Sequence, residues 1–303
     1  MHLRTLVAGA VAAALGATTL AGTAWAEILP TVPGARGAAA ADPPVIPESA
    51  PMEHIQGLQK VADANGGNRA HGRPGFKASI DYVKGKLDAA GFTTSVQNFT
   101  HNGATGWNLI ADWPHGDANN VVFLGAHLDS VPAGPGINDD GSGTASLMAV
   151  ALEVAKSNVK PAKRLRFGWW GAEELGLIGS KYYTQQLPAD ERKKIAVYLN
   201  FDMVGAKGTQ TWGVYEQSSE YNAIWKDYFK GKNIPTKNVN YGDRSDHGSF
   251  LRIGVKVSGI GSGSDPCYHK ACDTTSNVDA RTMGVTTNAI AHVAWKLSGA
   301  RRY

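Results

Sequence analysis

Apolar residues in the first part of the chain recur at the spacing of amphipathic helices. Residues 54–64 and residues 76–90 each carry an apolar side chain every three or four positions. Helices commonly stop at glycine, and these segments run into Asn65-Gly66-Gly67 and into Gly91. The pattern therefore predicts two helices that each bury one face.

The rest of the chain alternates short apolar runs with further helical segments. Runs of strand length occur at residues 92–99, 107–113, 120–124, 165–170, 195–201 and 255–260. Helical segments are predicted at residues 143–156, 220–230 and 282–297. Strands that alternate with helices predict an α/β fold, here a single domain with a mixed, mainly parallel β-sheet core and helices on both faces.

Polar residues that can bind metals follow three of the predicted strands. The strand at residues 120–124 leads into His127, the next strand leads into Glu173 and Glu174, and the one after that leads into Asp202. The carboxyl ends of parallel strands lie side by side, and ligands of open α/β sheets bind there. We therefore expect these side chains to converge at one edge of the sheet.

The chain of 303 residues begins with a segment typical of exported proteins. No charged residue follows Arg4 until after Ala24-Trp25-Ala26, an A-x-A cleavage pattern. We expect a signal peptide at residues 1–26, a linker or propeptide at 27–50 and the folded domain at 51–303. The alternative is an uncleaved membrane anchor, because the uncharged run is just long enough to span a bilayer. Its alanine and threonine content favours cleavage.

The charge and the cysteines narrow the possible partners and the compartment. The formal net charge is +4 and the basic residues are scattered, which argues against nucleic acid as a dedicated partner. Cys267 and Cys272 are close together in a chain that has the features of an exported protein, so we expect a local disulfide. A zinc knuckle that uses His269 between them is the alternative.

The predicted edge of the sheet offers more ligands than one catalytic zinc requires. Such a zinc takes three protein ligands and a water. The candidate ligands have nitrogen and oxygen donors that suit zinc: His127, Asp139, Glu174, Asp202 and His269. Five suit two metals that share a carboxylate, the arrangement used by aminopeptidases and phosphatases. Adjacent residues cannot point the same way, so one of Glu173 and Glu174 can bind metal while the other acts as a general base.

Each of these residues also has an ordinary structural interpretation. A lone histidine after a strand is more often a satisfied polar group than a ligand, and Asp139-Asp140-Gly141 alone is a turn with a helix cap. Glu173-Glu174 alone is an exposed helix start, favoured by the helix dipole. Because all of them are expected at the same edge of the sheet, we favour a metal hydrolase.

Five motifs, in order along the chain, resemble the M28 family of zinc aminopeptidases. They are Gly125-Ala-His-Leu-Asp-Ser130, Asn138-Asp-Asp-Gly-Ser-Gly143, Ala172-Glu-Glu-Leu-Gly-Leu-Ile-Gly-Ser180, Asn200-Phe-Asp-Met203 and Cys267-Tyr-His-Lys-Ala-Cys-Asp273. The resemblance extends from Asn65 to the closing helix. It implies the fold of zinc exopeptidases and two Zn²⁺ ions per chain. His127 and Asp202 would hold one zinc, Glu174 and His269 the other, and Asp139 would bridge them.

The same resemblance assigns roles around the two metals. Glu173 would be the general base, and Tyr268 would donate to the oxyanion of the tetrahedral intermediate. The Asp129 carboxylate would hold the second nitrogen of His127. Asp140 would help to set an unusual cis peptide after Asp139, and Arg244 would lie on the substrate side.

The sequence departs from the family pattern at two places. Only Gly261-Ser-Gly-Ser264 follows the last predicted strand, where the nearest members of the family carry a long loop that walls the substrate pocket. Some members bind calcium through aspartates near the mature amino terminus and in the closing helix. The matching segments, Pro44–Pro47 and Gly284–Asn288, contain no carboxylate, so we expect no calcium site of that kind.

The resemblance implies a secreted aminopeptidase that hydrolyses the amino-terminal bond of peptides and proteins by means of a two-zinc-bound water. Its partners would be peptides with a free amino terminus, with a preference for apolar first residues. We expect a monomer with no nucleic-acid partner, and no membrane contact after signal cleavage. The rivals are a zinc carboxypeptidase, for which Arg244 is the only evident carboxylate ligand, a one-zinc glutaminyl cyclase, and a non-catalytic binding domain.

Overall fold

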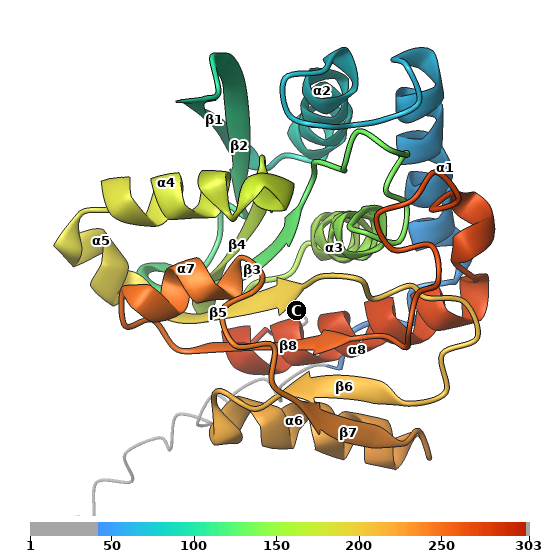
Figure 1. Cartoon of the computed structure of the whole chain (residues 1–303). Coiled ribbons are helices and arrows are strands. Elements are labelled where there is room, and N and C mark those ends of the chain that lie inside the picture. The colour runs from blue at the N-terminus through green and yellow to red at the C-terminus, as the bar shows by residue number, and fades with distance from the viewer. Residues whose placement is uncertain (1–41, 301–303) are drawn as a thin grey trace, which may run out of the picture. The chain divides into compact units, whose positions relative to one another are not determined.

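The computed structural model describes residues 42–300, which form an eight-stranded sheet with helices on both of its faces (Figure 1). The predicted signal peptide and residues 27–41 of the predicted linker lie outside the described residues. In the described part of the chain, no helix has the length and the apolar character needed to cross a membrane.

The sheet is mixed, with parallel strands at its centre. Its order is β1-β2-β4-β3-β5-β8-β6-β7. The pairs β3–β4, β3–β5 and β5–β8 are parallel, as is β6–β7, while β1–β2, β2–β4 and β6–β8 are antiparallel. The strands are β1 (Thr93–His101), β2 (Ala104–Asp112), β3 (Asp117–His127), β4 (Lys163–Trp170), β5 (Ile195–Phe201), β6 (Trp212–Tyr215), β7 (Thr236–Val239) and β8 (Val257–Gly261).

The helices form one layer on each face of the sheet. One face carries α1 (Ser49–Ala64), α2 (Pro74–Ala89), α3 (Gly141–Lys156), α6 (Ser219–Gly231) and α8 (Ala280–Ser298). The other face carries α4 (Ile178–Gln186), α5 (Ala189–Lys194) and α7 (His247–Arg252). The single α/β domain and the mixed sheet predicted from the sequence are therefore confirmed.

Helix α3 packs closely on the sheet because its first turn is made of small residues. It contacts α1, α8 and the central strands, and most of its residues are buried. A Cβ at Gly143 would lie 2.0 Å from the carbonyl oxygen of Phe201, so only glycine allows this approach. The helix therefore begins directly beside the end of β5, which brings the loop before α3 close to Asp202.

The fold begins before the predicted domain start at residue 51. Ile46 is buried, and its backbone N–H and C=O are both hydrogen-bonded to the Asn288 side chain on α8. Helix α1 already starts at Ser49. Part of the segment assigned to the linker thus packs against the domain.

Candidate metal centre

The candidate ligands lie at the carboxyl ends of four neighbouring strands. His127 ends β3, Glu174 follows β4, Asp202 follows β5 and His269 lies in the loop after β8. Asp139 comes from the loop between β3 and α3, and the Asp139–Asp140 peptide is cis, as expected. Residues far apart in the sequence thus meet at one edge of the sheet.

One group of ligand atoms surrounds His127, which is buried. Its Nε2 lies 3.2 Å from Asp139 Oδ1 and 3.7 Å from Asp202 Oδ1. The three residues offer ligand atoms that all lie within 4.8 Å of one another. This group has the members that the sequence resemblance assigns to the first zinc.

The second group surrounds His269 and shares Asp139 with the first. His269 Nε2 lies 3.1 Å from Asp139 Oδ2 and 2.8 Å from Glu174 Oε2. These ligand atoms also lie within 4.8 Å of one another. Because the two oxygens of Asp139 face different groups, this carboxylate can bridge two ions.

The unpaired oxygens at this edge of the sheet fit metal binding. Asp139 Oδ2, Glu174 Oε1 and Asp202 Oδ1 are buried and make no hydrogen bond within the described residues. Buried carboxylate oxygens without a partner are costly unless a cation neutralises them. Ligands about 2.0 Å from a tetrahedral zinc lie roughly 3.3 Å apart, which is close to the nitrogen–oxygen distances in both groups.

The charges of the carboxyl groups differ with their surroundings. Burial raises the pKa of Asp139, but its close contacts with His127 and His269 outweigh burial and hold that pKa at about 2. Burial and the Asp139 charge raise the pKa of Glu174 to about 8. Burial also raises the pKa of Glu173 well above its usual range, and the charge of Asp246 adds to that effect.

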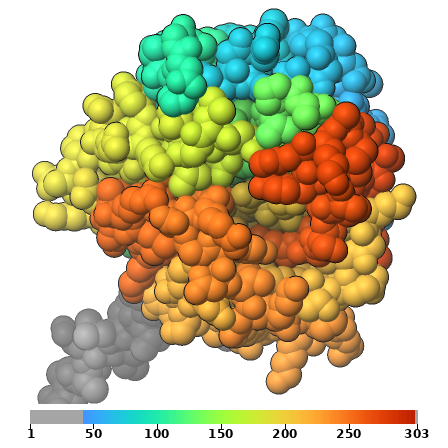
Figure 2. Space-filling model, in the orientation of Figure 1, coloured from blue at the N-terminus to red at the C-terminus, as the bar shows by residue number. Residues whose placement is uncertain are grey.

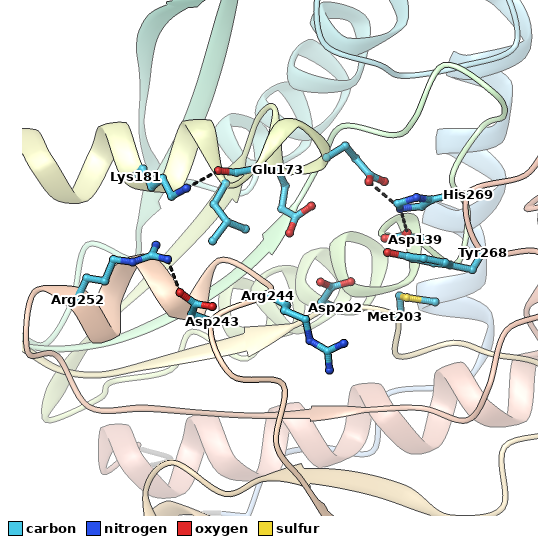
Figure 3. Close-up of a pocket in the computed structure, with 13 residues that line it drawn as sticks. Asp139, Glu173, Lys181, Asp202, Met203, Asp243, Arg244, Arg252, Tyr268 and His269 are labelled. Carbon is cyan, nitrogen blue, oxygen red and sulfur yellow. Dashed lines mark hydrogen bonds and ion pairs between the residues drawn. The ribbon is translucent and has the colours of Figure 1, made fainter.

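Glu173 is turned differently from its neighbour Glu174. Its Oε2 lies 3.9 Å from His127 Nε2, on the side of the first group, and it belongs to neither group of candidate ligands. Figure 3 shows its carboxylate pointing into the cavity beside Asp139 and Asp202. Glu174 thus belongs to the second ligand group, whereas Glu173 faces the cavity on the side of the first group.

Asp129 and Asp140 support the ligands from beneath. The Asp129 carboxylate accepts hydrogen bonds from the backbone N–H groups of Glu173 and Glu174. The second nitrogen of His127 lies 3.1 Å from the Asp129 backbone carbonyl and 3.6 Å from its carboxylate, so the nearer oxygen is not the predicted one. The backbone N–H groups of His127, Gly143 and Met203 donate to the Asp140 carboxylate, which ties together β3, α3 and the end of β5.

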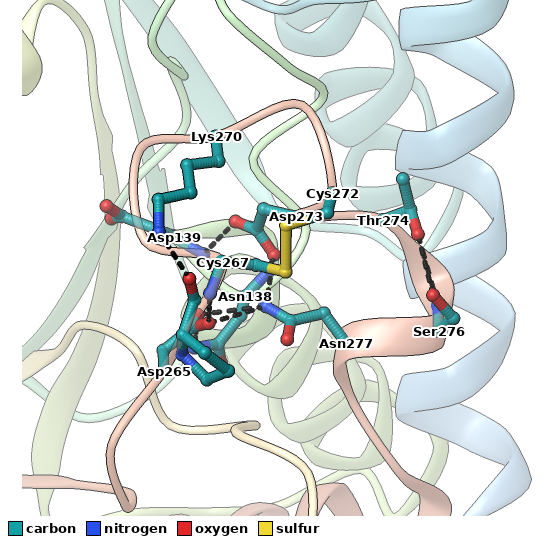
Figure 4. Close-up of a disulfide and its surroundings, with 11 residues drawn as sticks. Asn138, Asp139, Asp265, Cys267, Lys270, Cys272, Asp273, Thr274, Ser276 and Asn277 are labelled. Atoms are coloured by element: carbon teal, nitrogen blue, oxygen red, sulfur yellow. Dashed lines mark hydrogen bonds between the residues drawn. A yellow bond between two sulfur atoms is a disulfide. The ribbon is translucent and has the colours of Figure 1, made fainter.

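The predicted disulfide between Cys267 and Cys272 is present and encloses Tyr268 and His269 (Figure 4). The residue after it, Asp273, accepts hydrogen bonds from the backbone N–H groups of Asn138 and Asp139, at 2.8 and 3.0 Å. The disulfide loop and the loop that carries Asp139 are therefore held together. The zinc-knuckle alternative is excluded because both sulfurs are bonded to each other.

Tyr268 lies at the surface of the cavity. Its ring stacks on the ring of His269 with the centroids 3.8 Å apart, and Figure 3 shows its hydroxyl turned toward Asp139. Burial and the charges of Asp139 and Glu174 raise its pKa to about 12. The hydroxyl therefore stays protonated and can donate a hydrogen bond.

Two cavities open at this site, and Figure 2 shows the hollow between α4, α7 and the red segment after β8. The first measures about 440 Å³ and is lined by Glu173 and by four of the five candidate ligands, namely Asp139, Glu174, Asp202 and His269. The second measures about 400 Å³ and is lined by Tyr215, Tyr241 and the short Ser262–Asp265 segment. Asp202, Met203, Arg244 and Tyr268 line both cavities.

Several residues around the site were not singled out from the sequence. Lys181 and Arg252 line the first cavity, and Arg69 lies buried beneath the metal-binding loop. Asp246 is fully buried, and burial raises its pKa to about 7. No short motif marks these residues, since their positions depend on how distant segments pack. The Asp-Arg-Ser-Asp-His run around Arg244 was the one available signal for Asp246.

Sequence comparison relates the chain to known peptidases. The model of peptidase family M28 matches residues 108–294. Leupeptin-inactivating enzyme 1 from Streptomyces exfoliatus is 49% identical over 281 residues, which cover 86% of this chain and 64% of that protein. Aminopeptidase Y from Saccharomyces cerevisiae is 38% identical over 204 residues, 61% of this chain and 37% of the relative. The chain thus spans less than two thirds of the length of these relatives.

Structural comparison shows the same fold at low sequence identity. A zinc aminopeptidase from Bacillus subtilis, BSAP, aligns with a TM-score of 0.76 at 16% identity over 83% of this chain and 95% of that chain. A glutaminyl cyclase from Bacteroides thetaiotaomicron aligns with a TM-score of 0.71 at 20% identity over 84% of this chain and 99% of that chain. The fold therefore accommodates more than one chemistry, and the function has to be argued from the site.

Proposed function

Because the chain belongs to peptidase family M28, we propose that it is an exported zinc aminopeptidase that removes the amino-terminal residue from peptides. The observation that carries this proposal is the position of Asp139, whose two oxygens face two separate groups of ligands. Two metals that share a carboxylate are typical of aminopeptidases.

We assign five residues to two zinc ions. His127 and Asp202 would hold one ion, Glu174 and His269 the other, and Asp139 both. When bound, zinc polarises a carbonyl group and lowers the pKa of water. The unpaired oxygens of Asp139, Glu174 and Asp202 support this assignment.

Glu173 is assigned as the general base. It faces the cavity between the ligand groups without belonging to either, so its carboxylate is free to take a proton from the attacking water. Burial raises its pKa well above its usual range, which helps it to hold that proton until the leaving amine receives it. Asp129 fixes the orientation of this residue through its backbone N–H.

Tyr268 and the carboxylates would orient the substrate. The Tyr268 hydroxyl remains protonated and is turned toward the ligands, so it can donate to the oxyanion that forms from the scissile carbonyl. The free ammonium group of the substrate would be attracted to the same acidic edge of the sheet. This requirement for a free amino terminus makes the enzyme an aminopeptidase.

The second cavity would receive the side chain of the first residue. Met203 and the rings of Tyr215 and Tyr241 give it apolar surface, which favours an apolar side chain. Ser245, Ser262 and Ser264 add polar surface, and the short segment after β8 lines the cavity. We therefore expect a broad preference with leucine among the good substrates.

We also propose that the protein is secreted and acts as a monomer. The predicted signal sequence at residues 1–26 and the disulfide between Cys267 and Cys272 support an oxidising compartment. Export would be checked by sequencing the amino terminus of the protein recovered from the culture medium.

Blocked peptides test the reaction directly. Leucine p-nitroanilide and a carboxyl-amidated leucyl peptide should be hydrolysed, whereas their N-acetylated forms should not, because acetylation removes the ammonium group. Cleavage of an N-acetylated peptide that keeps a free carboxyl end would instead support a carboxypeptidase. Cyclisation of an amino-terminal glutamine without hydrolysis would support a glutaminyl cyclase.

A further inference from the structure

The first cavity extends from the candidate metal groups toward a set of positively charged side chains. Asp139, Glu174 and His269 line one end, and Lys181, Arg244 and Arg252 also line the cavity (Figure 3). Figure 3 shows Lys181 and Arg252 on the side away from His269 and Tyr268. A volume of about 440 Å³ lies within the range of small-molecule sites.

Two of these three cations have no carboxylate partner within residues 42–300. Lys181 Nζ donates to the backbone carbonyl of Gly176 at 2.7 Å, and Arg244 Nε donates to the backbone carbonyl of Tyr241 at 3.2 Å. Only Arg252 forms an ion pair, with Asp243. Within residues 42–300, Asp243 is thus the one carboxylate paired with these cations, and the Lys181 ammonium group lines the cavity without an ion pair.

The three cations come from separate elements. Lys181 lies in the first turns of α4, Arg252 ends α7, and Arg244 lies in the loop before α7. Helices α4 and α7 pack against each other, so Lys181 and Arg252 border the same side of the cavity, whereas Figure 3 shows Arg244 beside Asp202. Lysine and arginine at such a position bind carboxylates through charge-assisted hydrogen bonds.

In the proposed reaction, a short peptide substrate would place its terminal carboxylate near these cations. The amino terminus and the scissile carbonyl would lie at the acidic end with the metal ligands, and the leaving residues would extend away from it. An extended chain advances about 3.3–3.6 Å per residue, so in a dipeptide or tripeptide the terminal carboxylate follows soon after the scissile bond. In a long polypeptide that position holds a neutral peptide group.

We propose that Lys181 and Arg252 form a subsite for a carboxylate on the leaving side of the substrate. The enzyme would accordingly favour short peptides with a free carboxyl terminus, or an acidic residue after the scissile bond. This inference rests on the proposed aminopeptidase function and adds a substrate class to it.

Matched pairs of substrates test the subsite. Leu-Gly is compared with Leu-Gly-amide for the terminal carboxylate, and Leu-Asp-amide with Leu-Asn-amide for a side-chain carboxylate. The readout is the ratio of kcat/KM within each pair, which does not depend on the fraction of active enzyme. We expect wild type to favour the charged member of at least one pair by about 5-fold or more, the scale of a partly exposed charge-assisted contact.

Variants then assign the preference to these side chains. Lys181→Met should bring the favoured ratio close to one, and Lys181→Glu should reverse it. Arg252→Met should also lower it, whereas Lys230→Met, on the exposed side of α6 outside both cavities, should leave it unchanged. Calorimetric titration with Gly-Gly and with its amide gives a second readout, in which wild type binds the free acid more tightly and Lys181→Met does not.

The outcomes separate this inference from the function on which it rests. Hydrolysis of both members of each pair at equal rates, or a preference that Lys181→Met and Arg252→Met leave intact, would overturn the subsite and preserve the aminopeptidase. Hydrolysis of neither member would overturn the aminopeptidase and the subsite together.

Discussion

At the scale of single residues, Asp139 connects the two groups of candidate ligands. Its backbone N–H donates to Asp273, and its two side-chain oxygens face His127 and His269. Neighbouring groups hold its pKa at about 2, so it stays ionised near neutral pH. A bridging ligand has to carry charge, and this residue satisfies that requirement.

Arg69 stabilises the loop that carries Asp139 without contacting any candidate ligand. It is fully buried, and its guanidinium donates to the backbone carbonyls of Leu128, Pro135 and Gly136. Its charge also lies near Asp129, Asp140 and Asp273. It therefore provides both hydrogen bonds and a buried positive charge beneath an acidic site.

We predict that Arg69→Met lowers the free energy of unfolding by about 3–5 kcal/mol, because it leaves buried carbonyls without donors and carboxylates without a counter-charge. Urea denaturation measures this change. Arg73→Met, four residues further along and exposed, is the matched control and should change stability by less than about 0.5 kcal/mol. Equal effects of the two variants would contradict the role given to Arg69.

The buried His54 should make the folded domain less stable at acidic pH. It is buried between α1 and α2 near the Tyr82 hydroxyl, and burial together with the Lys86 charge lowers its pKa to about 4. The folded chain keeps this histidine neutral below pH 6.5, while the unfolded chain protonates it. Stability is therefore complete above pH 6.5 and falls by about 1.4 kcal/mol per pH unit until about pH 4.

The test compares wild type with His54→Gln in urea denaturation from pH 7 to pH 4. The difference between the two proteins removes the effects of other titrating groups and of metal loss, which both share. We expect the variant to lose less stability than wild type over this range. Parallel pH profiles would show that the pKa of His54 is not lowered in the fold.

At the scale of elements, the site is built where four adjacent strands end. The sequence predicted these strands because β3, β4, β5 and β8 each contain a short, mainly apolar segment, and the candidate ligands follow these segments. The tight start of α3 beside β5 then brings Asp139 over the same edge. The convergence of the candidate ligands could be predicted because each lies within a short motif at the end of an element.

Other elements gave no usable signal in the sequence. Strands β6 and β7 have four residues each, and β7 is half-exposed, so neither shows a clear apolar pattern. Helix α5 has six residues and buries none of them. Helices α4 and α7 were also not predicted, and they carry Lys181 and Arg252 into the cavity. The substrate side of the site depends on this packing, which periodicity cannot show.

The Cys267–Cys272 disulfide should stabilise the domain and the position of His269. Replacing Cys267 and Cys272 by serine should lower the free energy of unfolding by about 2 kcal/mol, as expected for a short loop. It should also weaken zinc binding at the Glu174–His269 group, because His269 lies inside the loop, and leave the His127–Asp202 group less affected. Chelator competition measures both zinc ions, and equal affinities in the variant and wild type would contradict this prediction.

At the scale of the whole molecule, the charge distribution is uneven. The chain has a formal net charge of +4, yet four carboxylates of the proposed site lie at one edge of the sheet. Two cationic metals would offset this local repulsion. The carboxylates that would bind the metals in the proposed reaction thus also affect the stability of the fold.

Metal removal should therefore destabilise the domain. A ligand at about 1,000 times its dissociation constant stabilises a protein by about 4 kcal/mol, so chelation should lower Tm by about 10 °C for a domain of this size. Calorimetry with EDTA, followed by added zinc, measures the loss and its recovery.

Calcium added to the zinc-loaded protein should leave Tm unchanged, because the segments that match the calcium-binding segments of other family members lack carboxylates. A calcium-dependent rise traced to those segments would contradict that expectation.

The most direct test of the proposed function combines zinc content per chain with leucine release from leucine p-nitroanilide, for wild type, Glu173→Ala and Glu174→Ala. We predict two zinc ions in wild type. Glu173→Ala should keep both and lose activity by at least about 100-fold, as for a general base, whereas Glu174→Ala should lose zinc as well. One zinc or none in wild type, or a Glu173→Ala variant as active as wild type, would contradict the two-zinc aminopeptidase.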